Sequence, residues 1–128
     1  MNKAAVYDTR FFITLFAPDN DQTARKIRNE MTRKERYVSS VVVHELYYTS
    51  LANEGWQTAQ TKAAHLKADF EVVPVNERIA EFSAELRHKY HISMGDSMIA
   101  ATAYALGAVC ITDDVHIRQI KEIQTQWL

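Results

Sequence analysis

Residues 93–111 read SMGDSMIAATAYALGAVCI, an apolar helical stretch followed directly by a short apolar strand. Ser93 lies three residues before Asp96, and this S-x-x-D spacing resembles a capping box at the start of a helix. Gly107 is placed to end the helix, and the next four residues form a continuous apolar run. Such a run is typical of a buried strand in a parallel sheet that is covered by helices.

The rest of the chain repeats this alternation of strand and helix. Strands are predicted over residues 4–7, 37–41, 70–75 and 108–111, and Pro74 places the third strand at a sheet edge. The pattern predicts an α/β protein of three layers, α/β/α, with a small parallel sheet of four to five strands. The predicted helices cover residues 11–16, 21–33, 42–55, 56–69, 77–90 and 94–106, with a last short helix over 117–123 that leads to a terminal strand.

The composition indicates one globular domain, residues 1–128, in a reducing compartment. The chain is 47% hydrophobic and 24% charged, which is the balance of a folded domain. Cys110 is the one cysteine, so no internal disulfide can form. No apolar run is long enough to span a membrane, and the stretch before the first strand is too short for a signal peptide. The expected location is therefore the cytoplasm, with no membrane partner.

The charge is nearly balanced, with 15 Lys and Arg against 16 Asp and Glu. A protein that coats nucleic acid would be strongly basic, so that class is excluded. Basic residues still gather within residues 25–36. This run is either a solvated helix face or a surface that steers phosphate groups, and both interpretations stay open.

Four acids follow strand ends or begin helices. Asp8 directly follows the first strand, Glu45 lies in the helix after the second, Asp96 begins the apolar helix, and Asp114 follows the fourth strand. Strand ends and helix starts share one edge of a βαβ sheet, which is where such folds place their sites. We therefore expect these four residues, the acidic set, to lie together.

A shared position for four carboxylates has a chemical consequence. Two such groups about 4 Å apart repel by roughly 4 kcal/mol at an effective dielectric near 20, so protons or cations must neutralise them. Oxygen ligands suit Mg²⁺ or Mn²⁺ better than Zn²⁺, and one or two such ions suit the cleavage of a phosphodiester. The alternative is that each acid only caps a helix or complements its dipole.

Four segments, in this order, resemble the PIN domain family, and within it the VapC-type toxins of toxin–antitoxin pairs. The opening strand and first acid, Val6-Tyr7-Asp8-Thr9, are similar to the family's, as is the serine-containing segment Tyr37–Leu46 that leads to a helical Glu-Leu. The most specific match is Asp96-Ser97-Met98-Ile99-Ala100-Ala101-Thr102-Ala103, because the family reads Asp, two variable residues, then Ile-Ala-Ala-Thr-Ala. Ile111-Thr112-Asp113-Asp114 resembles its closing Thr-x-Asp.

The resemblance implies a metal-dependent endoribonuclease. In this reading Asp8, Glu45, Asp96 and Asp114 hold one or two Mg²⁺ or Mn²⁺ ions, and cleavage of RNA leaves a 5′-phosphate and a 3′-hydroxyl. It also implies a homodimer and a small antitoxin protein whose C-terminal segment blocks the site. Two alternatives stay open: a PIN nuclease of RNA maturation, and a PIN-like binding module without catalysis. A phospho-accepting receiver domain is disfavoured, because Asp69 precedes its strand and Lys121 lies in a predicted helix.

The chain departs from the family beside the acidic set. Many members continue with an acid and Phe where this chain has His116 and Ile117, which makes Asp113 a candidate substitute. Arg10 is unusual beside the first acid, and we predict that it contacts an RNA phosphate, against the alternative of simple surface solvation. Three hydroxyl residues are candidates for hydrogen bonds that support the site, against ordinary turn and strand-end roles: Thr9, Ser39 and Thr112.

Overall fold

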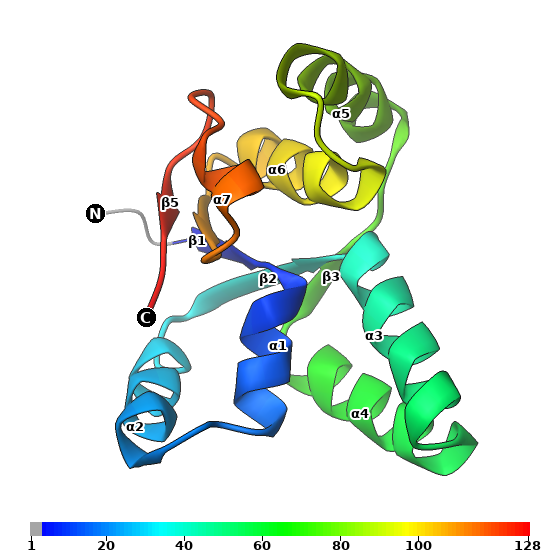
Figure 1. The fold of residues 1–128 in the computed structure, drawn as a ribbon, viewed down its shortest axis with the longest axis vertical. Coiled ribbons are helices and arrows are strands. Elements are labelled where there is room, and N and C mark those ends of the chain that lie inside the picture. The colour runs from blue at the N-terminus through cyan, green and yellow to red at the C-terminus, as the bar shows by residue number, and fades with distance from the viewer. Residues whose placement is uncertain (1–3) are drawn as a thin grey trace.

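A parallel sheet of five strands runs through the computed structural model, which describes residues 4–128 (Figure 1). The strand order is β3-β2-β1-β4-β5, and all four neighbouring pairs are parallel. The predicted α/β class is thus confirmed, as is the edge position of the third strand. The predicted domain 1–128 includes residues 1–3, which lie outside the described residues. The strands are β1 (Ala4–Tyr7), β2 (Glu35–Ser39), β3 (Glu71–Val73), β4 (Val109–Ile111) and β5 (Thr125–Gln126).

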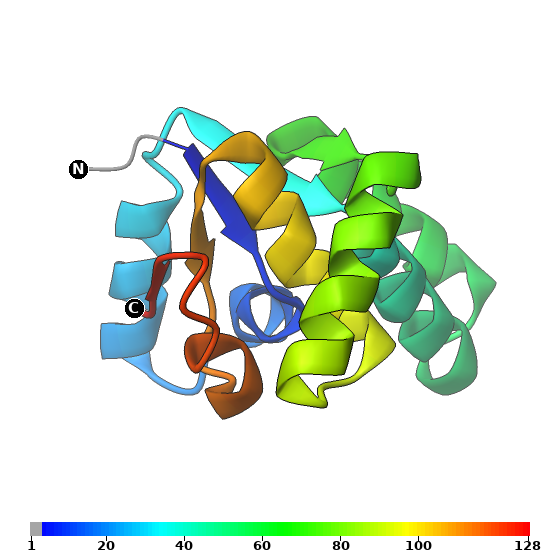
Figure 2. The ribbon, with the colours of Figure 1, turned by 90° about the horizontal axis from the view of Figure 1, so that it is seen from above.

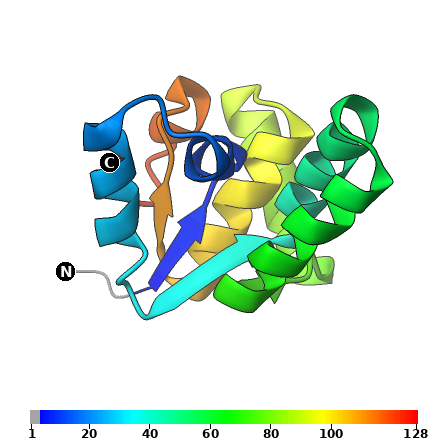
Figure 3. The same cartoon turned by 90° about the horizontal axis from the view of Figure 1, so that it is seen from below.

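Helices cover both faces of the sheet and make the three predicted layers. Below the sheet in Figure 1 lie α1, α2 and α4, and Figure 3 shows these helices from their own side. Above it lies α6, with α5 packed beside α6, as Figure 2 shows from above. Helix α3 packs mainly on α4. The helices are α1 (Thr9–Phe16), α2 (Asp21–Glu30), α3 (Ser40–Asn53), α4 (Trp56–Asp69), α5 (Glu77–Tyr90), α6 (Met94–Leu106) and α7 (Val115–Arg118). None of the helices described is long and apolar enough to cross a membrane.

The apolar α6 begins and ends as its sequence predicts. The Ser93 hydroxyl accepts a hydrogen bond from the Asp96 amide at 3.1 Å, and Gly107 ends the helix in the left-handed conformation (φ 59°) that glycine tolerates. Ala100, Ala101 and Ala103 are buried. Small side chains let the helix approach the sheet closely, which fixes where Asp96 at its first turn can lie.

Several predicted boundaries are wrong. The last helix was expected over 117–123 but covers Val115–Arg118, and the first helix begins at Thr9 rather than at residue 11. The third strand was expected over 70–75 but covers only Glu71–Val73.

Two further differences have local reasons. The second strand was expected over 37–41, but it covers Glu35–Ser39. The Ser39 hydroxyl accepts a hydrogen bond from the Val41 amide and caps α3, so the β-branched residues Val41 to Val43 belong to the helix. The second helix was expected to reach residue 33, but α2 ends at Glu30 because the chain turns there toward β2.

Aromatic rings fill the core between β1 and the helices below it. Tyr7, Phe11, Phe12 and Phe70 are all at most 3% exposed. The ring centroids of Tyr7 and Phe11 lie 4.5 Å apart, and those of Phe12 and Phe70 lie 4.8 Å apart. Such tilted and edge-to-face contacts add to the hydrophobic burial of each ring. They hold the end of β1, and therefore Asp8, against α1 and α4.

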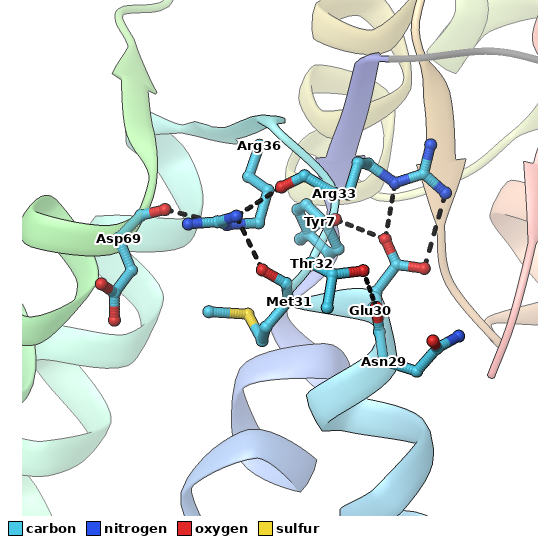
Figure 4. A network of polar contacts seen from close by, with 8 residues as sticks. All are labelled: Tyr7, Asn29, Glu30, Met31, Thr32, Arg33, Arg36 and Asp69. Carbon is cyan, nitrogen blue, oxygen red and sulfur yellow. Dashed lines mark hydrogen bonds and ion pairs between the residues drawn. The ribbon is translucent and has the colours of Figure 1, made fainter.

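The hydroxyl of Tyr7 ends in a buried polar cluster (Figure 4). It donates a hydrogen bond to Glu30 Oε2 at 2.6 Å, and Arg33 Nε donates to the same oxygen at 2.6 Å. The side chains of Glu30 and Arg33 are only 12% and 14% exposed. Burial and the Glu30 carboxylate raise the pKa of Tyr7, which keeps the phenol a donor. We call Tyr7, Glu30 and Arg33 the balanced cluster.

Arg36 continues this network from the end of α2 toward the end of α4 (Figure 4). Its guanidinium donates to the carbonyls of Met31, at 2.8 Å, and of Arg33, and to the Asp69 carbonyl at 3.0 Å. Arg36 thereby ties the turn before β2 to the turn before β3. Two members of the basic run, Arg33 and Arg36, therefore have structural roles, which neither interpretation of that run anticipated.

Candidate active site

Two members of the acidic set come from neighbouring strands. Tyr7 of β1 pairs with Ile111 of β4, and the Asp8 amide donates to the Ile111 carbonyl at 3.1 Å. The chain continues from β4 through Thr112 to Asp114, so both acids leave the sheet at its carboxyl edge. This edge is the candidate active site.

Asp8 lies deepest, with 4% of the residue exposed. Its Oδ2 accepts a hydrogen bond from the Thr112 hydroxyl at 2.6 Å, and its Oδ1 accepts one from the Thr9 amide at 2.6 Å. Burial raises the pKa of Asp8 even though these two hydrogen bonds favour the carboxylate, and the nearby charges of Asp96 and Asp114 raise it further. The predicted support from Thr112 is therefore present as a direct contact.

Glu45 reaches the same edge from α3. The Thr9 hydroxyl donates a hydrogen bond to Glu45 Oε1 at 2.9 Å. The other oxygen, Oε2, lies 3.5 Å from the position that a Cβ on Gly95 would take. This is an ordinary van der Waals distance, so the Glu45 carboxylate lies against the first turn of α6, directly before Asp96.

Asp96 completes the group from α6. Partial burial raises its pKa first, and the negative charges of Asp114 and Glu45 raise it further, while the hydrogen bond from Ser93 and the charge of His116 lower it. Asp96 therefore interacts electrostatically with Asp8, Asp114 and Glu45. The edge carries an excess of negative charge in a partly desolvated place.

Helix capping explains two of the four acids. Asp8 is the N-cap of α1, and Asp114 is the N-cap of α7, where its Oδ1 accepts a hydrogen bond from the His116 amide at 2.8 Å. Glu45 and Asp96 cap nothing, because Ser39 and Ser93 cap their helices. Asp96 still lies in the first turn of α6, where its charge complements the helix dipole. The alternative of capping or dipole complement thus accounts for three of the acidic set and leaves Glu45 without such a role.

The chemistry of the four acids suits a hard divalent cation, but their side chains are not placed around a common point. The four acids offer only oxygen ligands, and the raised pKa values of Asp8 and Asp96 indicate charge that a cation would neutralise. Within residues 4–128, however, no group of three or more His, Cys, Asp or Glu side chains is arranged to hold a metal ion. Both oxygens of Asp8 and one of Asp114 accept hydrogen bonds within the chain. A shared ion therefore requires acid side chains to turn toward it.

The remaining predicted residues divide between the site and the fold. Thr9 and Thr112 contact acids, as described above, whereas Ser39 is fully buried and caps α3, which is the strand-end alternative. Arg10 Nε lies 2.7 Å from Asp113 Oδ1, so these two predicted residues pair with each other.

Sequence reasoning missed two neighbours of the acidic set. Gly95 lies against Glu45, and its place directly before Asp96, as one of three glycines in the chain, was a usable signal. Arg118 donates to the Thr112 carbonyl at 3.2 Å, and nothing in the local sequence indicated that contact.

Comparison with known proteins gives the class of this chain. The PIN domain family model matches residues 5–123, and the protein therefore belongs to the PIN domain family. Among similar solved structures, VapBC2 from Rickettsia felis, bound to a promoter DNA fragment, has a TM-score of 0.81 at 18% identity, over 97% of this chain and 98% of that one. VapBC-1 from nontypeable Haemophilus influenzae has a TM-score of 0.78 at 22% identity, over 96% of both chains.

A third similar structure is VapC20 of Mycobacterium tuberculosis, described as a toxin that cleaves the sarcin-ricin loop. Its TM-score is 0.70 at 18% identity, over 87% of this chain and 90% of that one. No match to a curated protein was found at the sequence level. At identities this low, the similarity shows only that the fold is shared over most of each chain. The class of protein follows from the family match.

Proposed function

We propose that this protein is a metal-dependent endoribonuclease and the toxin of a VapBC-type toxin–antitoxin pair. The observation that carries the proposal is that four acids from four separate segments lie at one sheet edge, where two threonine hydroxyls hold Asp8 and Glu45. The charges of Asp96 and Asp114 raise the pKa of Asp8 there. Membership of the PIN domain family supports a nuclease, and the likeness to VapC20, a toxin that cleaves an RNA loop, supports RNA as the substrate.

In this proposal the acidic set holds one or two Mg²⁺ or Mn²⁺ ions. When bound, such ions stabilise the negative charge that develops on the attacked phosphate and make water a stronger acid. The chain itself orients the ligands. The Thr112 hydroxyl holds one oxygen of Asp8, and the Thr9 hydroxyl holds one oxygen of Glu45, so two threonines limit how these carboxylates can turn.

A protein partner is supported by apolar side chains that water reaches. Ile13 of α1, Tyr48 and Leu51 of α3, and Trp56 of α4 are between 42% and 67% exposed. Large exposed apolar groups on neighbouring helices are typical of protein-binding surfaces. We assign this surface to contacts within a homodimer and with a small antitoxin protein, in line with the VapBC complexes among the similar structures. Action on RNA with such a partner places the protein in the cytoplasm.

The proposal predicts cleavage of RNA that needs a divalent ion and the acidic set. The purified full chain should cleave labelled RNA with Mg²⁺ or Mn²⁺, and EDTA should abolish the cleavage. Asp96→Asn should lower the rate at least a hundredfold, on the order of the loss when one group that stabilises the transition state is removed. Asp19→Asn is the matched control, because Asp19 is exposed and distant from the site.

Binding separates this proposal from a module without catalysis. Titration calorimetry should show Mn²⁺ binding to the wild type and weaker binding to Asp96→Asn. Binding of Mn²⁺ and RNA with no cleavage would favour the module, and equal cleavage by the wild type and Asp96→Asn would mean a contaminating nuclease. Growth arrest on expression, relieved by the product of an adjacent gene for a small DNA-binding protein, distinguishes a toxin from an RNA-maturation enzyme.

A further inference from the structure

An ion pair lies beside the acidic edge, by which we mean the carboxyl edge of the sheet where the acidic set lies. Arg10 follows Asp8 by two residues, in the first turn of α1, and its side chain is 62% exposed. Its Nε lies 2.7 Å from Asp113 Oδ1, and Asp113, with 31% of its side chain exposed, stands between Thr112 and Asp114. The pair thus joins the segments that carry two acids of the acidic set.

This edge poses a problem for any RNA that approaches. A phosphate group meets the acidic set and Asp113, all of them negative. Two guanidinium groups stand beside the same turn, Arg10 and Arg118, and they are held differently. Arg118 donates to the Thr112 carbonyl, which is neutral, while Arg10 is paired with a carboxylate, which competes directly with a phosphate.

Arg10 can exchange Asp113 for a phosphate with little loss of free energy. The Arg10 side chain is 62% exposed, and Asp113 Oδ1, which is buried, has no hydrogen-bond partner among the described residues. The contact is therefore charge attraction without a hydrogen bond, and exposed ion pairs contribute roughly 0.2–1 kcal/mol, so little is lost when it opens. A guanidinium binds phosphate through two parallel hydrogen bonds in a planar fork, which is stronger than a contact through Nε alone. The exposed side of Arg10 faces solvent, where a strand of RNA can reach it.

We propose that Arg10 binds a phosphate of the RNA strand beside the acidic edge and that Asp113 is an internal competitor that holds Arg10 until RNA displaces it. This inference rests on the proposed function, because it names how the same site takes its substrate. Asp113 therefore lowers the affinity for RNA while it remains paired, and Arg10 raises it once released. Arg10 contacts the substrate itself, and Asp113 is a positioning residue that acts through Arg10.

The test measures RNA binding rather than cleavage. A fluorescent single-stranded RNA oligonucleotide is titrated, at several NaCl concentrations, with full-chain protein carrying Asp96→Asn to prevent cleavage. In that background, Arg10→Ala should weaken binding roughly fivefold to tenfold and reduce the slope of log K against log salt by about 0.7, the value for one lost phosphate contact on a single strand. Asp113→Asn should tighten binding about threefold, since its competing charge is gone.

The double variant isolates the exchange. With Arg10→Ala already present, Asp113→Asn should have a much smaller effect, because no guanidinium is left to release. Arg25→Ala, an exposed arginine on α2, is the matched control and should change affinity little. Arg10→Lys should restore the salt slope but only part of the affinity, because it keeps the charge and loses the fork. Urea unfolding checks that each variant is folded, and Asp113→Ser replaces Asp113→Asn if the latter is not.

The outcomes distinguish this inference from the proposed function. If the protein binds and cleaves RNA but Arg10→Ala leaves affinity and salt slope unchanged, the inference is wrong and the proposed function stands. Equal losses in Arg10→Ala and Arg25→Ala mean general charge attraction and also overturn it, as does an Asp113→Asn effect of the same size in the double variant. If the wild type neither binds nor cleaves RNA, both the inference and the proposed function are wrong.

Discussion

Tyr7 and Asp8 are neighbours in the sequence, yet they enter opposite kinds of polar cluster. The Tyr7 hydroxyl joins the balanced cluster, where the Glu30 carboxylate meets the Arg33 guanidinium and the phenol (Figure 4). Asp8 enters the acidic set, where the nearest charged partners are other acids. Two adjacent residues therefore belong to two kinds of cluster: the negative charge near Tyr7 is balanced by an arginine, and the negative charges near Asp8 repel one another.

The difference shows how a functional cluster can be told from a structural one. In the balanced cluster each buried polar group has a partner of opposite or complementary character, which is what stability requires. At the acidic edge, burial raises the pKa of Asp8, two hydrogen bonds oppose that rise, and the charges of Asp96 and Asp114 add to it. A fold retains such repulsion where a ligand of opposite charge is to bind, so the uncompensated cluster marks the site.

The largest predicted effect breaks the balanced cluster. Glu30→Ala leaves the buried Arg33 guanidinium and the Tyr7 hydroxyl without their carboxylate, and should lower the free energy of unfolding by about 3 kcal/mol. Urea unfolding followed by circular dichroism measures it. Glu85→Ala, on an exposed position of α5, is the control and should stay near the wild type. A loss below about 1 kcal/mol for Glu30→Ala would mean that the cluster is not the structural element described above.

The opposite sign is predicted at the acidic edge. Asp96→Asn removes one repelling charge and should raise the free energy of unfolding at neutral pH in buffer with EDTA by about 1 kcal/mol, the scale of partly exposed charge pairs. The same urea experiment measures this, with Asp19→Asn as the neutral comparison. A destabilised Asp96→Asn protein, under those conditions, would contradict the view that this edge sacrifices stability.

The smallest predicted effect is a pH dependence of the stability difference between the wild type and Asp96→Asn. The pKa of Asp96 in the folded protein lies above its ordinary value of 3.8, so the folded state binds more protons than the unfolded state between the two values. The wild type therefore loses stability relative to Asp96→Asn as pH rises from about 4 through that window, and the difference then levels off. Unfolding curves in EDTA from pH 4 to 8 measure it, and a difference that is largest at pH 4 would refute it.

Sequence patterns predict the features of this fold that depend on local signals and on topology. The predicted ranges 56–69 and 77–90 agree with the helices Trp56–Asp69 and Glu77–Tyr90, because apolar periodicity marks both and a breaker, Gly55 or Pro74, precedes each. The shared edge of the acids follows from the βαβ rule alone. The predictions fail where a side chain overrides the pattern, as at Ser39, whose cap converts an apparent strand residue, Val41, into helix.

Contacts between distant residues were beyond the sequence. Nothing near Tyr7 indicates that Glu30 is its partner, and nothing near Arg10 indicates Asp113, because each pair forms only when the sheet brings their segments together. The side-chain arrangement at the acidic edge is likewise a property of packing. Glu45 lies in van der Waals contact with the first turn of α6 at Gly95, and a pattern of acids does not contain that contact.

The position of β1 has a consequence for how the acidic edge is assembled. Strand β1 is the middle strand of the sheet, and its partner β4 comes much later along the chain, since Ala5 pairs with Val109. The hydroxyl that holds Asp8 lies 104 positions later along the polypeptide. Closing so large a loop is slow, so the acidic edge forms only once β4 has joined β1. A fragment that lacks the segment after β4 also lacks the hydroxyl that holds Asp8.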